Sequence, residues 1–222
     1  RGLRTPLTAM RAGLDVGIGD RDRTDSGRAV LASVRDDVDR MSRTVDNLMT
    51  LARADDGRLD LRRSEVDLDE LARSAASPLQ ALAAAKNVTV LTRGERTQVR
   101  ADPQRLHQAL TNLIENAIKY TAREGEVVVS TWMGGHEAGV TVCDNGIGIP
   151  GEAQAHVFDR FFRADRSRSR ESGGSGLGLA ICYEIAAAHG GRIWVDSEDG
   201  VGSSFSIALP ADSAQATTPE AP

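Results

Sequence analysis

A strict alternation of apolar residues, three and then four apart, limits the possible folds more than any other feature of this sequence. The apolar positions are Leu31, Val34, Val38, Met41, Val45, Leu48 and Ala52. Arginine and aspartate fill many of the positions between them, so the apolar residues form one seam along a helix. Because such a seam must be buried against other helices, it predicts a coiled coil or a helical bundle.

A second helix is predicted before this one, because apolar residues recur there in steps of four, three and four. They are Leu3, Leu7, Met10 and Leu14. Pro6 lies inside this pattern and removes a backbone hydrogen bond, so we expect a kink around residues 1–5. Two helices alone bury the seam poorly. We therefore expect a homodimeric four-helix bundle made of two hairpins.

After the hairpin, helical and strand periods alternate. Helices are predicted over 68–86, 103–120, part of 151–173 and 177–189, and strands over 88–92, around 99, 126–132, 139–144, 192–196 and 204–209. This order predicts an α+β fold in which helices cover one face of a mixed sheet. The predicted organisation is a helical hairpin at 1–56, a linker at 57–65, an α/β-sandwich domain at 66–210 and a disordered tail at 211–222.

Composition argues against several kinds of protein. The net charge is -5, and no basic patch is interleaved with aromatic residues, so nucleic acid is not expected as a partner. No apolar run approaches the roughly 18 residues of a membrane span, and no signal peptide is evident, so this piece is expected to be soluble and cytosolic. Cys143 and Cys182 are predicted to be reduced core residues. The histidines share no ligand spacing, which makes a structural zinc site improbable.

The first candidate site is the stretch 144–150, Asp-Asn-Gly-Ile-Gly-Ile-Pro, which follows an apolar strand. Gly146 and Gly148 allow the backbone to turn sharply, so that a flat ligand can lie against it. An ionised Asp144 only accepts hydrogen bonds, and so favours the amino group of adenine over the carbonyl group of guanine. By itself, the same pattern is also typical of a plain hairpin or loop.

The second candidate site is a polar stripe on the helix predicted at 103–120. Asn112, Asn116 and Lys119 lie on one face of this helix, opposite its apolar side. A neutral amide oxygen can ligate Mg²⁺, and a lysine ammonium group can balance the charge of phosphates. The alternative is a solvated helix face, although such faces usually mix Glu, Lys and Arg.

The third candidate site is the run of glycines at 173–178, which leads directly into a helix. Backbone N–H groups at the start of a helix bind phosphate oxygens, and glycine lets them approach closely. The spacing matches neither a Walker A loop nor a dinucleotide-binding fingerprint, and the protein-kinase signatures are missing. A flexible hinge leading into the helix is the competing interpretation.

Together these stretches resemble, in order and spacing, the sequence boxes of bacterial sensor histidine kinases. Residues 112–120 resemble the N box, 144–148 the G1 box, 158–163 the F box, 174–179 the G2 box and 202–205 a G3-like element. Residues 3–8 are similar to the stretch just after the phosphoacceptor histidine. The resemblance covers about residues 1–210. It implies a dimerisation and histidine-phosphotransfer hairpin, followed by a catalytic ATP-binding domain of the histidine kinase and Hsp90-like type.

The resemblance also implies roles for individual residues. It implies that Asp144 holds the adenine amino group and that Asn116 ligates Mg²⁺. Asn112 and Lys119 would support the phosphates, with Lys119 contributing to catalysis. The other nucleotide-binding residues that it implies are Tyr120, Gly146, Gly148, Arg163, Gly174, Gly176, Leu177, Gly178 and Ser203. Arg163 would reach the γ-phosphate, and residues 151–173 would form a mobile lid.

The family reaction is transfer of the γ-phosphoryl group of ATP to a histidine on the helical hairpin, and then to an aspartate of a response regulator. The implied cofactors are ATP and Mg²⁺, and the implied partners are a second copy of the chain and a response-regulator receiver domain. Thr5 matches part of the family's phosphatase pattern and is an implied catalytic residue. Members of the family are usually membrane-anchored, so this piece is expected to be a cytoplasmic portion of such a sensor.

The sequence departs from the family at one place. Arg1-Gly2 stands before Leu3, where the family has His-Glu. Arginine stays protonated and cannot accept a phosphoryl group, and glycine cannot replace the acid. Three explanations stay open. Arg1-Gly2 is foreign or erroneous sequence at the start of a fragment, or the chain is a degenerate kinase that acts as an ATP-responsive dimeric binding module, or it is another relative such as an ATPase-fold serine kinase.

Overall fold

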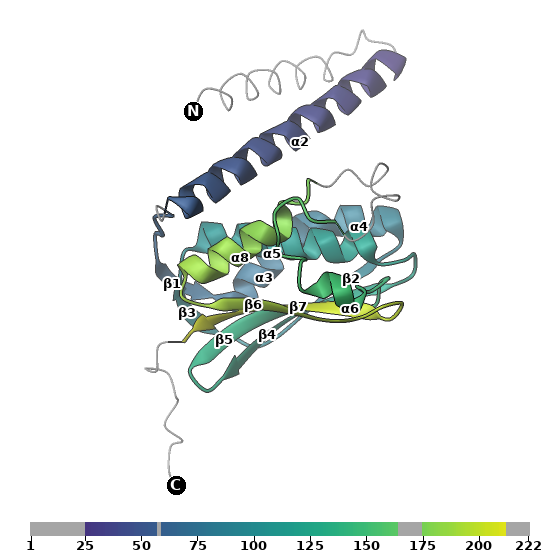
Figure 1. Cartoon of the computed structure of the whole chain (residues 1–222). Helices are drawn as coiled ribbons and strands as arrows, with labels where there is room; N and C mark the ends of the chain where they lie inside the picture. The colour runs from purple at the N-terminus through teal and green to yellow at the C-terminus, as the bar shows by residue number, and fades with distance from the viewer. Residues whose placement is uncertain (1–24, 57–58, 164–174, 212–222) are drawn as a thin grey trace. The chain divides into compact units, whose positions relative to one another are not determined.

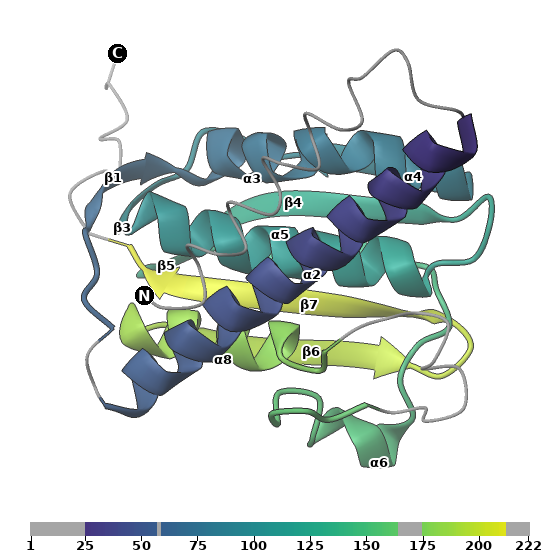
Figure 2. The same cartoon turned by 90° about the horizontal axis from the view of Figure 1, so that it is seen from above.

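The computed structural model describes residues 25–56, 59–163 and 175–211 (Figures 1 and 2). The chain divides between residues 57 and 58 into two compact units, and each is described by itself. The predicted first helix with its kink at Pro6, the acceptor position and the predicted tail beyond Ala211 lie outside the described residues. No helix in the described ranges combines the length and the apolar character that crossing a bilayer requires.

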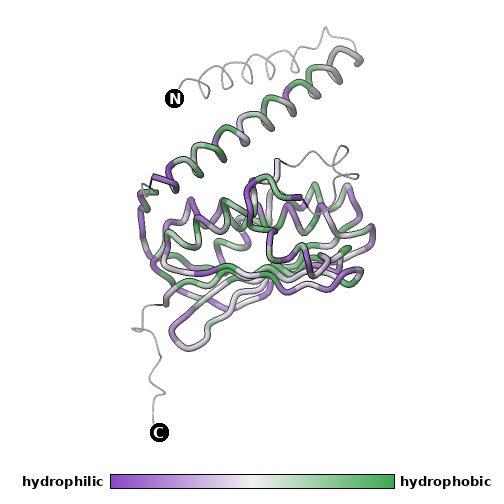
Figure 3. Tube along the Cα trace, in the orientation of Figure 1, coloured by the Kyte–Doolittle hydropathy of each residue, from purple (hydrophilic) through white to green (hydrophobic). Residues whose placement is uncertain are grey.

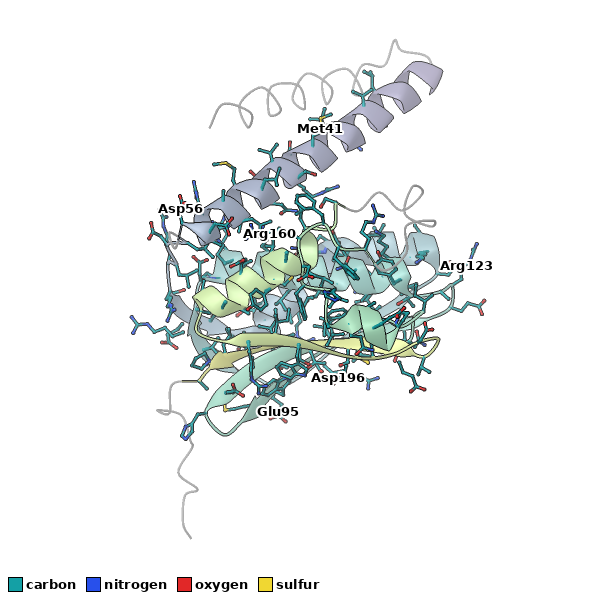
Figure 4. All side chains as sticks on the ribbon, in the orientation of Figure 1. Met41, Asp56, Glu95, Arg123, Arg160 and Asp196 are labelled. Atoms are coloured by element: carbon teal, nitrogen blue, oxygen red, sulfur yellow. The ribbon has the colours of Figure 1, made fainter. Side chains whose placement is uncertain are left out.

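Over its described residues, 25–56, the first unit consists of a long helix, α2, which spans Asp25–Asp55. Hydrophobic and hydrophilic residues alternate along it (Figure 3), as the sequence predicts. Val34, Met41 and Leu48 lie seven residues apart, and 43%, 54% and 45% of their surfaces are exposed. Part of the predicted seam, including Met41 (labelled in Figure 4), is therefore left uncovered within one chain.

The second unit is built on a five-stranded sheet in the order β2-β4-β5-β7-β6. The strands are β2 (Thr89–Arg93), β4 (Glu126–Gly134), β5 (Glu137–Asp144), β6 (Arg192–Glu198) and β7 (Gly202–Pro210). β2 is parallel to β4, whereas the other neighbours are antiparallel. The mixed sheet predicted from the sequence is confirmed.

Helices cover one face of this sheet, as Figures 1 and 2 show from two directions. They are α3 (Leu68–Ala76), α4 (Gln80–Lys86), α5 (Pro103–Tyr120) and α8 (Gly178–Ala188). The apolar side of α5 is buried: Leu113 and Ile114 are at most 1% exposed. Burial of side chains from both layers provides the main stabilising term of such a sandwich. The opposite side of α5 stays accessible and carries the polar stripe.

Three local features differ from the prediction. Pro78 interrupts the helix expected over 68–86, because proline has no N–H group, and the short 3-10 helix η1 (Ser77–Leu79) separates α3 from α4. β1 (Ser64–Asp67) pairs with β3 (Gln98–Ala101) and begins within the segment expected to be a linker. α6 (Gly151–Gln154) ends before Phe158, so the helix expected there is shorter.

The prediction that both cysteines lie in the core is confirmed for Cys182 and wrong for Cys143. The thiol of Cys182 is fully buried and donates to the carbonyl of Ala109 at 3.4 Å, and burial raises its pKa to about 12. Cys143 is exposed. Side chains alternate along β5, and Val142 and Asp144 take the buried side, so Cys143 must face the other way.

A buried histidine joins three segments of the second unit. His189, which follows α8, is 3% exposed; its Nδ1 lies 2.7 Å from the carbonyl oxygen of Ile185, and its Nε2 accepts the N–H of Asp102 at 2.9 Å. Because a carbonyl only accepts and an N–H only donates, the imidazole is neutral with its proton on Nδ1. The carboxylate of Asp102 caps α5 and accepts the N–H of Arg62 at 2.8 Å.

We expect this arrangement to make the second unit less stable in mild acid. Burial lowers the pKa of His189 and Arg63 lowers it further, whereas the hydrogen bond to Ile185 and the charge of Asp102 raise it. The unfolded chain therefore binds the proton more readily than the folded one. The stability that His189 contributes is complete above its unfolded pKa of about 6.5, and is lost as the pH falls from there toward the lower folded value.

Urea denaturation between pH 7 and pH 5 measures this effect. His189→Gln keeps a polar side chain at the site but does not titrate, so its unfolding free energy should depend less steeply on pH than that of the wild type. His136→Gln is the matched control, because His136 is exposed, and it should keep the wild-type slope. Identical slopes for wild type and His189→Gln would contradict the role given to His189.

Candidate functional site

Asp144 ends β5 on the buried side of the sheet, where it is 6% exposed. Its Oδ1 accepts the N–H of Gly146 at 2.9 Å. Burial raises the pKa of Asp144, whereas backbone hydrogen bonds from Gly146 and Ser203 lower it. A carboxylate with little access to water gains more from a donor that reaches it than one on the surface does. The arrangement therefore suits recognition of an N–H donor.

The loop after β5 requires glycine at both predicted positions. A Cβ atom at Gly146 would lie 2.5 Å from the carbonyl oxygen of Tyr120. Gly148 has φ +68, and a Cβ atom there would clash with the carbonyl group of Glu198. The N–H of Ile147 donates to the carbonyl of Tyr120 at 3.2 Å. The predicted sharp turn is therefore present, and it rests on the end of α5.

The polar stripe of α5 lies half-buried along one side of the helix. The amide of Asn112 donates to the carbonyl of Gly178 at 3.3 Å, which ties α5 to the first turn of α8. Among the residues that the structure describes, the side-chain amide of Asn116 has no hydrogen-bond partner, so its oxygen is open to a ligand. The ammonium group of Lys119 lies 5.0 Å from the ring centroid of Tyr120, which is 43% exposed.

The start of α8 is held by the segment that resembles the F box. Gly176 has φ +70, and a Cβ atom there would lie 2.9 Å from the Cα of Phe161. The carbonyl of Gly176 accepts the N–H of Phe161 at 2.9 Å. Leu177 is fully buried and fixes the beginning of the helix. At Gly178 an added Cβ atom would meet Asn112 only at ordinary contact distance, 3.7 Å.

Hydrogen bonds from α5 bring most of the predicted nucleotide-binding residues together. The middle of this helix contacts α8 through Asn112, and its last residue contacts the loop at 146–147. Asp144 in turn pairs in register with Ser203 of β7. Arg163 is the last residue described before the gap at 164–174. The predicted site residues outside the described ranges are Arg1, Thr5 and Gly174.

Sequence reasoning missed Lys86, the last residue of α4. Its ammonium group donates to the carbonyl of Ile118 at 2.9 Å and to that of Lys119. A cation at this place satisfies carbonyls that the end of a helix leaves unpaired. Burial lowers the pKa of Lys86, and the charge of Lys119 lowers it further. The contact with Ile118 joins positions 32 residues apart, so no local pattern reveals it.

Two family models match the chain. One, described as a His Kinase A (phospho-acceptor) domain, matches residues 2–57. The other, described as a Histidine kinase-, DNA gyrase B-, and HSP90-like ATPase, matches residues 101–213. Together they extend over both units of the structure.

Relatives with known names are similar to the chain along almost all of it. Sensor protein IrlS of Burkholderia pseudomallei is 34% identical over 212 residues, which cover 96% of this chain and 46% of the relative. The sensor-like histidine kinase SenX3 of Mycobacterium tuberculosis is 37% identical over 210 residues, covering 94% and 51%. The chain therefore spans about half the length of the curated relatives it matches.

Solved structures resemble the fold described above. Full-length ShkA in complex with AMPPNP aligns with a TM-score of 0.74 at 28% identity, covering 94% of this chain and 45% of that one. The catalytic domain of histidine kinase ThkA aligns with a TM-score of 0.60 at 30% identity, covering 67% of this chain and 95% of that one.

Proposed function

Since the chain belongs to the sensor histidine kinase family, we propose that it transfers the γ-phosphoryl group of ATP to a histidine and then to an aspartate of a response regulator. The observation that carries this proposal is the buried carboxylate of Asp144 beside the loop that rests on the end of α5. Asn116 and Lys119 continue from this point along the same helix. One end of the site suits a base and the other suits phosphates.

At the base end, the carboxylate of Asp144 accepts a hydrogen bond from the amino group of adenine. Its Oδ1 is already engaged by Gly146, and its ionised form has no proton to donate, so the carbonyl group of guanine would meet only an acceptor. The backbone of Gly146 and Gly148 forms the turn against which the base lies, and the exposed ring of Tyr120 lines it. Ser203 lies beside Asp144 on β7.

At the phosphate end, the open amide oxygen of Asn116 fits the hard-oxygen ligand that Mg²⁺ prefers. When bound, Mg²⁺ would neutralise part of the phosphate charge. Lys119 adds a positive charge, and Asn112 holds α5 against α8. The backbone N–H groups at Gly174, Gly176, Leu177 and Gly178 are proposed to donate hydrogen bonds to phosphate oxygens, and Arg163 is proposed to reach the γ-phosphate.

The proposed transfer breaks the bond between the γ-phosphorus and its bridging oxygen and forms a bond from phosphorus to an imidazole nitrogen, with ADP as leaving group. A loose transition state of this kind needs positioning and charge balance more than covalent assistance. Lys119 supplies charge near the transferred group. Thr5 is proposed to act in a separate phosphatase step, in which water takes up the phosphoryl group. In the full-length protein this portion is proposed to be the cytoplasmic part of a membrane-anchored sensor.

Arg1-Gly2 supports a second candidate function. Without an acceptor histidine at this position, the chain would be a dimeric module that binds ATP and does not label itself.

Acid-labile incorporation from γ-labelled ATP separates the two candidate functions. The Arg1→His, Gly2→Glu double variant restores the family's acceptor pair, and the chain as written is the control. Label in the variant alone would support the kinase. Absence of label in both, with ATP still bound, would favour the binding module.

The exposed apolar residues of the α2 seam, Val34, Met41 and Leu48, support a dimer through the hairpin. We expect Met41→Glu to weaken dimerisation about 100-fold, because a charge would have to be buried in an apolar seam. Sedimentation equilibrium measures this change. Arg43→Glu adds the same side chain at an exposed position two residues away and should leave the dimer intact. A Met41→Glu protein that sediments as the wild type does would refute the bundle.

A further inference from the structure

Three polar residues form a row across the sheet at the base end of the site. Asp144 of β5 pairs in register with Ser203 of β7, and Ser203 pairs in register with Ser197 of β6. Residues in register on neighbouring strands point to the same face. Asp196, the neighbour of Ser197, points to the face opposite the helices, as Figure 4 shows. Ser197 therefore faces the side on which Asp144 is buried.

The hydroxyl group of Ser197 contacts three groups at once. It accepts the N–H of Ile149 at 2.9 Å, and it lies 2.8 Å from the carbonyl oxygen of Gly202 and 3.1 Å from Oγ of Ser203. Ile149 belongs to the loop that follows Asp144. One side chain therefore connects this loop with the strand that carries Ser203.

Further hydrogen bonds seat the same loop on the turn between β6 and β7. The amide of Gln154 donates to the carbonyls of Ile149 and Ser197, at 2.9 and 2.7 Å. The N–H of Gly200 donates to the carbonyl of Ile147 at 2.8 Å. Ser197 takes part through both its side chain and its backbone, and its hydroxyl group also forms a hydrogen bond with the side chain of Ser203.

We propose that Ser197 is a positioning residue for recognition of the nucleotide base: its hydroxyl group fixes the Ser203 hydroxyl and the 144–150 loop on either side of Asp144. This rests on the proposed function, since it takes the base to lie at Asp144. When Ser197 donates to Oγ of Ser203, one lone pair of that oxygen is engaged and the Ser203 hydroxyl offers its proton to the base. Without Ser197 it rotates and can meet either a donor or an acceptor, so discrimination between adenine and guanine falls.

Binding of Mg-ATP and Mg-GTP to the wild type and to Ser197→Ala, by titration calorimetry or competition, tests the proposal. We expect Ser197→Ala to bind ATP about tenfold more weakly while its affinity for GTP stays within about twofold, so that the ratio of the two falls about tenfold. Ser197→Thr keeps the hydroxyl group and should keep the ratio. The matched control is Ser204→Ala, because Ser204 is the next residue of β7 and its side chain faces the opposite side of the sheet.

A double-variant cycle tests whether Ser197 acts through Ser203. If it does, Ser197→Ala combined with Ser203→Ala loses less discrimination than the sum of the two single losses. Additive losses, or an unchanged ratio in Ser197→Ala, would overturn the proposal. If Ser197→Ala does not fold, Ser197→Thr and Ser197→Val replace it, since they have nearly the same shape and differ in the hydroxyl group. A wild-type protein that fails to bind ATP would instead refute the proposed function.

Discussion

Asp144→Asn should weaken Mg-ATP binding about 100-fold, because a hydrogen bond to a charged, buried acceptor is worth roughly 1.5–3 kcal/mol. The oxygen that accepts the N–H of Gly146 must stay in place, so an asparagine would turn its NH₂ group toward the base. That group would face the amino group of adenine, and two donors repel. It would suit the carbonyl group of guanine, so binding of Mg-GTP should weaken less or improve.

Titration of both nucleotides against both proteins measures the effect. Asp196→Asn is the matched control. It makes the same change in charge, and Asp196 is exposed on the opposite face of the sheet. Because burial raises the pKa of Asp144, the wild type should also lose ATP affinity as the pH falls through that raised value, and Asp144→Asn should not. If Asp144→Asn bound ATP as tightly as the wild type does, the proposal that the base lies at Asp144 would be wrong.

Asn116→Ala should abolish most of the contribution of Mg²⁺ to nucleotide binding. The amide oxygen of Asn116 is open to a ligand, and its removal leaves the metal one protein ligand short. In the wild type, ATP should bind more tightly with Mg²⁺ than with EDTA. In Asn116→Ala the two affinities should be nearly equal, and labelling of the Arg1→His, Gly2→Glu background should fall about 100-fold.

Thr111→Ala is the control for this variant, because Thr111 is half-buried on the preceding turn of α5 and the helical period places it about 140° around the helix from Asn116. It should keep both the affinity in EDTA and the gain from Mg²⁺. If Asn116→Ala retained the whole gain, the metal would have to be placed elsewhere on the helix or on the substrate alone.

Features of the fold and of the site that are built from one continuous stretch of residues could be predicted from the sequence. The stripe on α5 follows from the helical period, and the turn at Gly146 and Gly148 follows from glycine's freedom at positive φ. The α+β sandwich and the seam of α2 follow from periodicity in the same way. These features need no knowledge of what lies opposite them.

Features that depend on a distant partner could not be predicted. Lys86 caps α5 across 32 residues, and β1 exists only because β3 lies beside it. Cys143 has apolar neighbours in sequence, but strand alternation places it on the uncovered face. Ser197 can be recognised as a neighbour of Asp144 and Ser203 only once the register of β5, β7 and β6 is known.

The joint between α5 and the loop after β5 is made by main-chain atoms, the N–H of Ile147 and the carbonyl of Tyr120. Substitution of either side chain leaves this bond in place, and only proline at position 147 would remove its donor. The two side chains themselves stay 42% and 43% exposed. Over evolutionary time, both positions can therefore change identity to suit different ligands or neighbours, while the backbone geometry that links the proposed base and phosphate ends of the site is kept.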